Sequence, residues 1–152
     1  MMVLIVPEAP DPGNADRVSW LKAAFLAVGA EPVVSAPVVP LRMASFVGPL
    51  GFWGLKDWRE KYRHETARAD LVIFVMDEAR GSDFGGPALN IVQEAAELRG
   101  IPVILASGAV ELASSALGNS GVAGGYEIAG PDQAAQVATT WMAKSSEGVS
   151  GD

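Results

Sequence analysis

Cysteine is absent from this chain of 152 residues, and positively charged residues are few. The absence of thiols excludes disulfides, thiolate metal sites and cysteine nucleophiles. Eleven Lys and Arg against 18 Asp and Glu give a formal net charge of −7. This charge argues against a nucleic-acid partner, because duplex binding depends largely on basic side chains that neutralise phosphates. It says less about a nucleotide-sized ligand, which backbone amides and a few polar groups can hold.

The chain also lacks targeting signals and several catalytic signatures. The opening Met1–Val6 has no basic start and meets Pro7 at once, so it is too short for a signal peptide or a membrane span. We therefore expect a cytoplasmic protein without a membrane partner. No Walker loop, Gly-x-Ser-x-Gly elbow or Gly-x-Gly-x-x-Gly turn supports nucleotide triphosphate hydrolysis, α/β-hydrolase chemistry or dinucleotide binding. The lone His64 has no metal-ligand partner in the sequence, and we expect neither a metal nor a cofactor.

Apolar residues make up about half of the chain and occur in short runs. The third run, Leu71–Met76, is the most strand-like, because six apolar residues without polar alternation suit a strand that is covered on both faces. Five strands are predicted in all: Val3–Val6, Pro32–Ser35, Leu71–Met76, Val103–Ala106 and Tyr126–Ile128.

Helical periodicity fills the segments between these runs. The first helix is expected to begin at Asn14 or Asp16 and to stop at Gly29. Three more are predicted from about Leu55 to Ala69, from Pro87 to Gly100 and from Val110 to Leu117, and a last one from Pro131. The expected buried positions are Ala88, Ile91, Val92, Ala95 and Leu98 in the third helix, and Ala134, Val137, Ala138 and Trp141 in the last.

Five alternations of strand and helix predict an α/β fold, with a doubly wound, five-stranded parallel sheet in three layers. Right-handed crossovers restrict the topology, and the flavodoxin-like order 2-1-3-4-5 is the natural choice for five strands. Residues 1–144 are expected to form a single domain. Residues 145–152 have the composition of a flexible C-terminal tail.

A binding crevice is expected where the strand order reverses, between the carboxyl ends of the first and third strands. The loop 77–86 places three acids and three glycines directly before a helix. Glycines let a ligand approach the backbone, and free amides at a helix start attract an anion or a hydroxyl. An ordinary polar turn, capped by Asp83, is the alternative. The candidate binding residues at this edge are Pro7, Glu8, Asp77, Gly85 and Gly86.

The connection after the second strand is unusually aromatic. Segment 46–54 places three aromatic residues among glycines, and this composition suits a lid that stacks on a base or ring. Phe52 and Trp53 are therefore further candidate binding residues. A satellite core, or the interface of a homo-oligomer, would explain the same side chains.

The segment from roughly Trp58 to Ala106 resembles the nucleoside 2-deoxyribosyltransferase-like family. The similarity lies in Ala69-Asp70 before an apolar strand, Asp83-Phe84-Gly85 before a helix, and Gly100-Ile101-Pro102 before the next strand. It implies chemistry at the N-glycosidic bond of a small-molecule nucleoside or nucleotide. In the family, a glutamate early in the helix attacks the sugar carbon, the base leaves, and another base or water replaces it.

The position of that glutamate is occupied differently here. The family pattern expects it near Leu89 or Asn90, and Asn90 has the right shape but cannot be a carboxylate nucleophile. Glu94 shares the face of Asn90 but lies one turn, about 6 Å, deeper along the helix. Glu94, Asp83 and Asn90 are therefore the candidate catalytic residues. A relative that binds nucleotides without turning them over is the second hypothesis.

Response-regulator receiver domains show the same alternation and give a third hypothesis. Phosphorylation of Asp77 would need an acidic pair at the end of the first strand and a lysine at the end of the fifth. Pro7 and Glu8 follow the first strand, and Ala129-Gly130-Pro131 follows the fifth. We therefore do not expect an active receiver, and only a partner-binding module of this shape remains.

Overall fold

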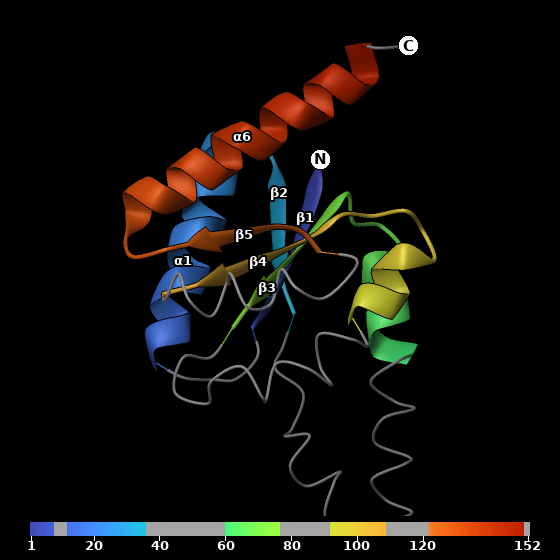
Figure 1. Ribbon diagram of the computed structural model, residues 1–152, viewed down its shortest axis with the longest axis horizontal. Coiled ribbons are helices and arrows are strands. Elements are labelled where there is room, and N and C mark those ends of the chain that lie inside the picture. Colours follow the sequence, from blue (N-terminus) through green and yellow to red (C-terminus); the bar gives the residue numbers. More distant parts are fainter. Residues whose placement is uncertain (8–11, 36–59, 77–91, 109–121, 151–152) are drawn as a thin grey trace, which may run out of the picture.

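A computed structural model describes residues 1–7, 12–35, 60–76, 92–108 and 122–150 of the chain (Figure 1). Its centre is a five-stranded sheet in the order β2-β1-β3-β4-β5, and every pair of neighbouring strands is parallel. This is the predicted strand order. The strands are β1 (Met2–Pro7), β2 (Glu31–Val34), β3 (Leu71–Val75), β4 (Val103–Ser107) and β5 (Val122–Glu127).

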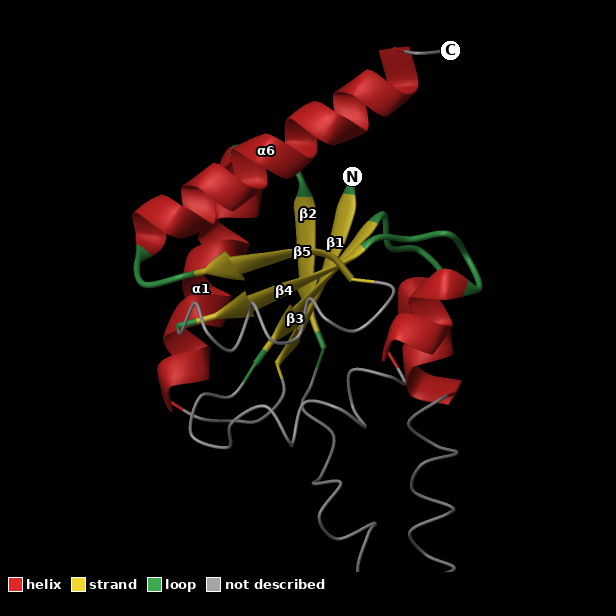
Figure 2. Cartoon of the chain, viewed as in Figure 1, coloured by secondary structure: helices red, strands yellow, loops and turns green. Residues whose placement is uncertain are grey.

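Helices cover both faces of the sheet and complete three layers (Figure 2). Helices α1 (Pro12–Ala27) and α6 (Pro131–Ser150) pack against each other on one face. The helical residues 60–66 and 92–97 lie on the opposite face (Figure 1). In the ranges that the structure describes, no helix is both long and apolar enough to cross a membrane.

Side chains of alternate residues in the central strands pack into two separate cores, one on each face of the sheet. In β3, Val72 and Phe74 face the helices 60–66 and 92–97, whereas Leu71 and Ile73 face α1 and α6. All of these side chains are fully buried. A strand with both faces covered needs no polar alternation, and this explains the continuous apolar run that predicted β3.

One outer edge of the sheet is β2, which carries a proline. The amides of Glu31 and Ser35 donate to Met1 O and Ile5 O of the neighbouring chain segment, at 2.8 Å each. Successive residues of a strand point their backbone groups to opposite sides, so residues 32 and 34 face away from β1. Pro32 has no amide to lose there, and this position is where a strand tolerates proline.

Several boundaries differ from the sequence predictions. Helix α1 begins at Pro12, before both predicted caps, since proline fits the first helical turn. The second helix ends at Thr66 rather than Ala69. By Asp70 the chain has joined the sheet, because the Asp70 amide donates to Met2 O at 2.8 Å. Helix α6 continues to Ser150, through residues predicted to be a tail, because extending an existing helix costs little.

Two further predictions on packing and strand length were wrong. Leu98 is 69% exposed, and Ala96 is buried instead. The chain leaves helical geometry after residue 97, which takes Leu98 off the buried stripe. Strand β5 begins at Val122, not Tyr126, and its pairing with β4 contains an irregularity between Val103 and Ile104. The predicted helix 110–117 lies outside the described residues.

Glycine ends two helices with a positive φ. Gly29 has a φ of 86° and Gly100 one of 67°. The residue after each glycine donates its amide back into the helix, from Ala30 to Phe25 O at 2.9 Å and from Ile101 to Ala96 O at 3.0 Å. This six-to-one bond defines a glycine-terminated helix end. The prediction that Gly29 stops the first helix is confirmed.

We expect Gly100→Ala to lower the free energy of unfolding by about 1 kcal/mol, because an L-residue at this φ is strained. A Cβ at Gly100 would meet no atom within 4 Å, so the loss reports backbone strain rather than a clash. Urea unfolding measures it, with the exposed neighbour Arg99→Ala as the control. Equal unfolding midpoints for Gly100→Ala and the wild type would contradict the assigned backbone.

Candidate functional site

The carboxyl ends of β1 and β3 lie side by side, as predicted. Pro7 pairs with Val75 at the last position of the β1–β3 register, so the two strands end at the same level. The chain leaves β1 through α1 on one face and leaves β3 toward the helical residues 92–97 on the other. The connections depart to opposite faces, and in open parallel sheets this reversal point is where ligands bind.

The structure places two of the sequence-predicted site residues. Pro7 is buried at the end of β1, next to the crevice position. Glu94 lies on the helix that follows β3. The other candidates lie outside the described residues, and their roles stay predictions: Glu8, Phe52, Trp53, Asp77, Asp83, Gly85, Gly86 and Asn90.

Glu94 forms an ion pair on the helical surface. Its Oε1 is 3.7 Å from Arg63 Nη2, and the two side chains are 48% and 53% exposed. Glu94 therefore lies on the exposed surface of its helix, paired with a residue of the neighbouring helix 60–66.

A polar cluster lies at the carboxyl end of β2. It consists of Ser35, Lys61, Tyr62 and Glu65, and we call it the Ser35 cluster. Lys61 Nζ donates to Ser35 Oγ at 3.2 Å and lies 3.7 Å from Glu65 Oε1. The same ammonium lies 5.2 Å from the centroid of the Tyr62 ring. Ser35 and Tyr62 are buried, at 2% and 3% exposure, beneath the more exposed Lys61 and Glu65.

Burial and charge shift the acidity of the Tyr62 hydroxyl. Burial of the phenol is the main cause, the nearby Glu65 carboxylate adds to it, and a hydrogen bond with Ser35 acts in the opposite direction. Together they raise the pKa of Tyr62 to about 12. Tyr62 is therefore a neutral hydroxyl at physiological pH, and not a phenolate base.

The opposite side of this edge is braced by α1 and α6. Arg17 of α1 donates from Nε to Ile128 O, just after β5, at 3.2 Å. Trp141 of α6 donates from Nε1 to the Tyr126 hydroxyl at 3.0 Å. The first bond ties α1 to the end of β5, and the second ties α6 to the same strand.

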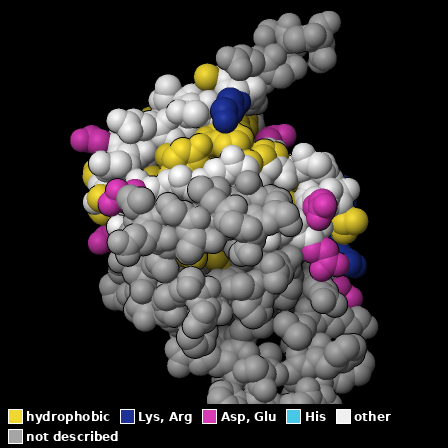
Figure 3. Space-filling model, viewed as in Figure 1, with side chains coloured by type: hydrophobic (Ala, Val, Ile, Leu, Met, Phe, Trp, Pro, Cys, Tyr) yellow, Lys and Arg dark blue, Asp and Glu magenta, His cyan; other side chains and the backbone are white. Residues whose placement is uncertain are grey.

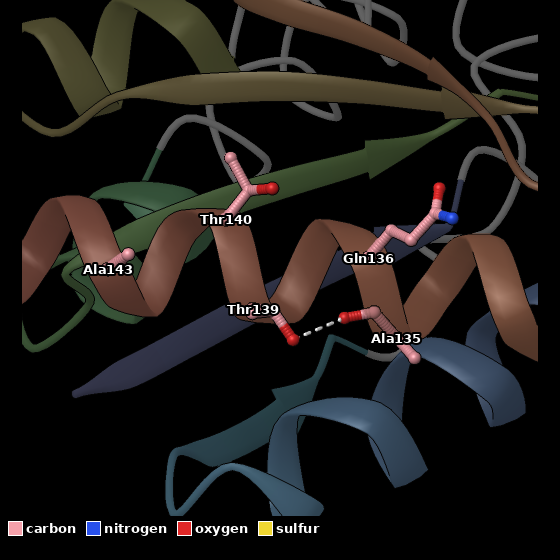
Figure 4. A pocket seen from close by; sticks show the side chains of 5 residues that line it. All are labelled: Ala135, Gln136, Thr139, Thr140 and Ala143. Carbon is pink, nitrogen blue, oxygen red and sulfur yellow. Dashed lines mark hydrogen bonds between the residues drawn. The ribbon is translucent and has the colours of Figure 1, made fainter.

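A shallow depression of about 420 Å³ lies on α6 (Figure 4). In the view of Figure 3, hydrophobic side chains form a band near this helix. Thr139 uses its hydroxyl to donate to Ala135 O at 2.9 Å. None of the side chains that line the depression is ionisable, which does not suit acid–base chemistry; they are Ala135, Gln136, Thr139, Thr140 and Ala143.

Sequence reasoning missed the Ser35 cluster as a site. The helical periodicity of residues 55–69 predicts an outward Lys61 and an inward Tyr62, and it links neither residue to Ser35. Two signals were available: a single polar residue closes β2, and Lys61 and Glu65 are four residues apart on a helix. Among the described residues, no group of three His, Cys, Asp or Glu side chains is arranged to hold a metal.

Comparisons with known proteins support the fold alone. No protein-family model matches the chain, and no curated protein matches it in sequence. Among solved structures, it is similar to the solution NMR structure of a de novo designed Rossmann 2x3 fold protein. The two share 8% identity with a TM-score of 0.50, over 94% of this chain and 90% of the design. The chain therefore has a Rossmann-like α/β fold.

Proposed function

We propose that the chain binds a nucleoside or nucleotide at the carboxyl ends of β1 and β3 and acts on its N-glycosidic bond. The observation that carries this proposal is the adjacency of the two strand ends, with Pro7 opposite Val75 and the flanking connections on opposite faces. Open parallel sheets bind ligands at this reversal point. The resemblance to the nucleoside 2-deoxyribosyltransferase-like family supports the choice of ligand and bond.

The chemistry follows from a carboxylate nucleophile. Glu94 would attack the anomeric carbon of the sugar while the bond from that carbon to the base nitrogen breaks. The departing base takes up a proton, and water or a second base then attacks the same carbon and releases the carboxylate. Asp83 is the second carboxylate that the proposal assigns to the site.

Loss of the nucleophile gives the sharpest test. Glu94→Gln is expected to lower base release by about three orders of magnitude or more, because an amide cannot replace the attacking carboxylate. Chromatography of free base measures this, with a panel of nucleosides and their 5′-monophosphates as substrates. Glu97→Gln is the matched control, since Glu97 is an exposed glutamate of the same helix.

Binding without turnover is the second candidate function. The observation that favours it is the environment of Glu94, which is half exposed and held in an ion pair with Arg63. In this case, the panel yields no free base, yet some of its members raise the melting temperature of the protein. If no member of the panel gives base release or a thermal shift, both candidates are overturned.

A further inference from the structure

The Ser35 cluster contains a buried acceptor that lacks a donor. Glu65 Oε2 is shielded from solvent and has no hydrogen-bond partner among the residues that the structure describes, whereas Oε1 of the same carboxylate lies 3.7 Å from Lys61 Nζ. Buried polar atoms are nearly always paired in folded proteins, so an unpaired carboxylate oxygen calls for a donor. The Glu65 carboxylate acts electrostatically on Tyr62, whose hydroxyl is already hydrogen-bonded with Ser35.

The charges of the cluster favour a neutral ligand group. The ammonium of Lys61 and the carboxylate of Glu65 balance each other, and a phosphate placed here would meet the charge of Glu65. A hydroxyl complements the pair, because its hydrogen can be donated to Glu65 while its oxygen accepts from Lys61. The side chains of Lys61 and Glu65 are 28% and 24% exposed, so the pair is partly open to solvent.

The cluster is within reach of the crevice. The Ser35 amide donates to Ile5 O, which places Ser35 at the end of β2, one strand away from β1. At a strand spacing of about 4.8 Å, β2 lies about 7 Å from the midline between β1 and β3. Helical side chains lean toward the N-terminus of their helix, so Lys61 and Glu65 lean toward the carboxyl edge of the sheet.

We propose that the Ser35 cluster is a hydroxyl-binding subsite of the crevice and that it binds the sugar of the nucleoside or nucleotide. Glu65 accepts a hydrogen bond from one sugar hydroxyl, and Lys61 donates to the same oxygen. Ser35 and Tyr62 are positioning residues that hold the ammonium of Lys61 at the end of β2. This inference rests on the proposed function and names the part of the ligand that the subsite selects.

Calorimetric titration with sugar analogues tests the subsite. The probes are adenosine, guanosine, cytidine and uridine, each with its 2′-, 3′- and 5′-deoxy analogue. For a nucleoside that binds, removal of one of the three hydroxyls is expected to weaken wild-type binding about tenfold, the effect of a lost charge-assisted hydrogen bond. In Glu65→Gln the same removal is expected to change affinity less than about twofold, because the charged acceptor is already gone.

Glu60→Gln, on the exposed start of the same helix, is the matched control and should keep the wild-type response. If Glu65→Gln does not fold, Lys61→Met removes the donor and is read in the same way. If a folded Glu65→Gln variant still loses affinity tenfold when the hydroxyl is removed, the subsite is overturned but the proposed function is not. The same holds if the wild type loses no affinity with any of the deoxy analogues. Absence of binding by every nucleoside, with no base release, overturns both.

Discussion

Phe74→Ala is expected to lower the free energy of unfolding by about 3–5 kcal/mol, the cost of a large cavity in a packed core. Phe74 is fully buried in the central strand β3, in the core beneath the helical residues 60–66 and 92–97. Domains of this size are stable by about 5–15 kcal/mol, so the substitution removes much of the total. Denaturant unfolding followed by circular dichroism measures the loss.

Two companion variants define the limits of this result. Ile73→Val, on the opposite face of β3, is expected to cost about 0.5–1.5 kcal/mol and to remain folded. Leu98→Ala is expected to change stability by less than about 0.5 kcal/mol, because Leu98 is 69% exposed. A loss below about 1.5 kcal/mol for Phe74→Ala would show that this face of the sheet is not packed as described.

Stability is also expected to fall between pH 10 and pH 12 because of Tyr62. The folded protein raises the pKa of Tyr62 to about 12, mainly by burial, from the ordinary value of 10.0. Over this range the unfolded chain releases the phenol proton while the folded chain retains it, so rising pH favours unfolding. The contribution of Tyr62 to the free energy of unfolding is fully present below pH 10. About 2–3 kcal/mol of it is lost by the time the pH passes the folded pKa.

The difference between the wild type and Tyr62→Phe isolates this effect. Urea unfolding of both proteins at pH 9, 10, 11 and 12 cancels the titration of lysines, which the two share. The stability of the wild type should fall more steeply than that of the variant over this range. Parallel curves would mean that the Tyr62 hydroxyl titrates alike in the folded and unfolded chains, and would contradict its burial beside Glu65.

Periodicity predicted the architecture because each strand face and helix stripe repeats a simple pattern. The central strands β1, β3 and β4 are continuous apolar runs, and their parallel order followed from the alternation with helices. Strand β5 was predicted only in part, since Gly124 and Gly125 carry no apolar side chain and its pairing with β4 is irregular. At Gly124 an added Cβ would come within 3.1 Å of the Tyr126 ring, so the glycine there reflects close packing that no local pattern records.

The candidate site was harder to predict than the fold. Topology predicts where strand ends meet, and Pro7 lies where it was expected. Side-chain clusters such as Ser35 with Lys61 join residues 26 positions apart, and only the packing of a helix against the edge strand brings them together. Family resemblance proposed Glu94, but its ion pair with Arg63 depends on two helices whose relative placement the sequence does not encode locally.

The proline of β2 has a consequence for how the molecule associates with others. Strands that join an exposed sheet edge do so through outward-pointing amides, and this route leads to sheet-to-sheet aggregation and to fibrils. Within Glu31–Val34, Pro32 leaves Val34 as the outward amide. An incoming chain would therefore find too few donors along β2 to continue the ladder, and growth of the sheet between molecules is disfavoured at this edge.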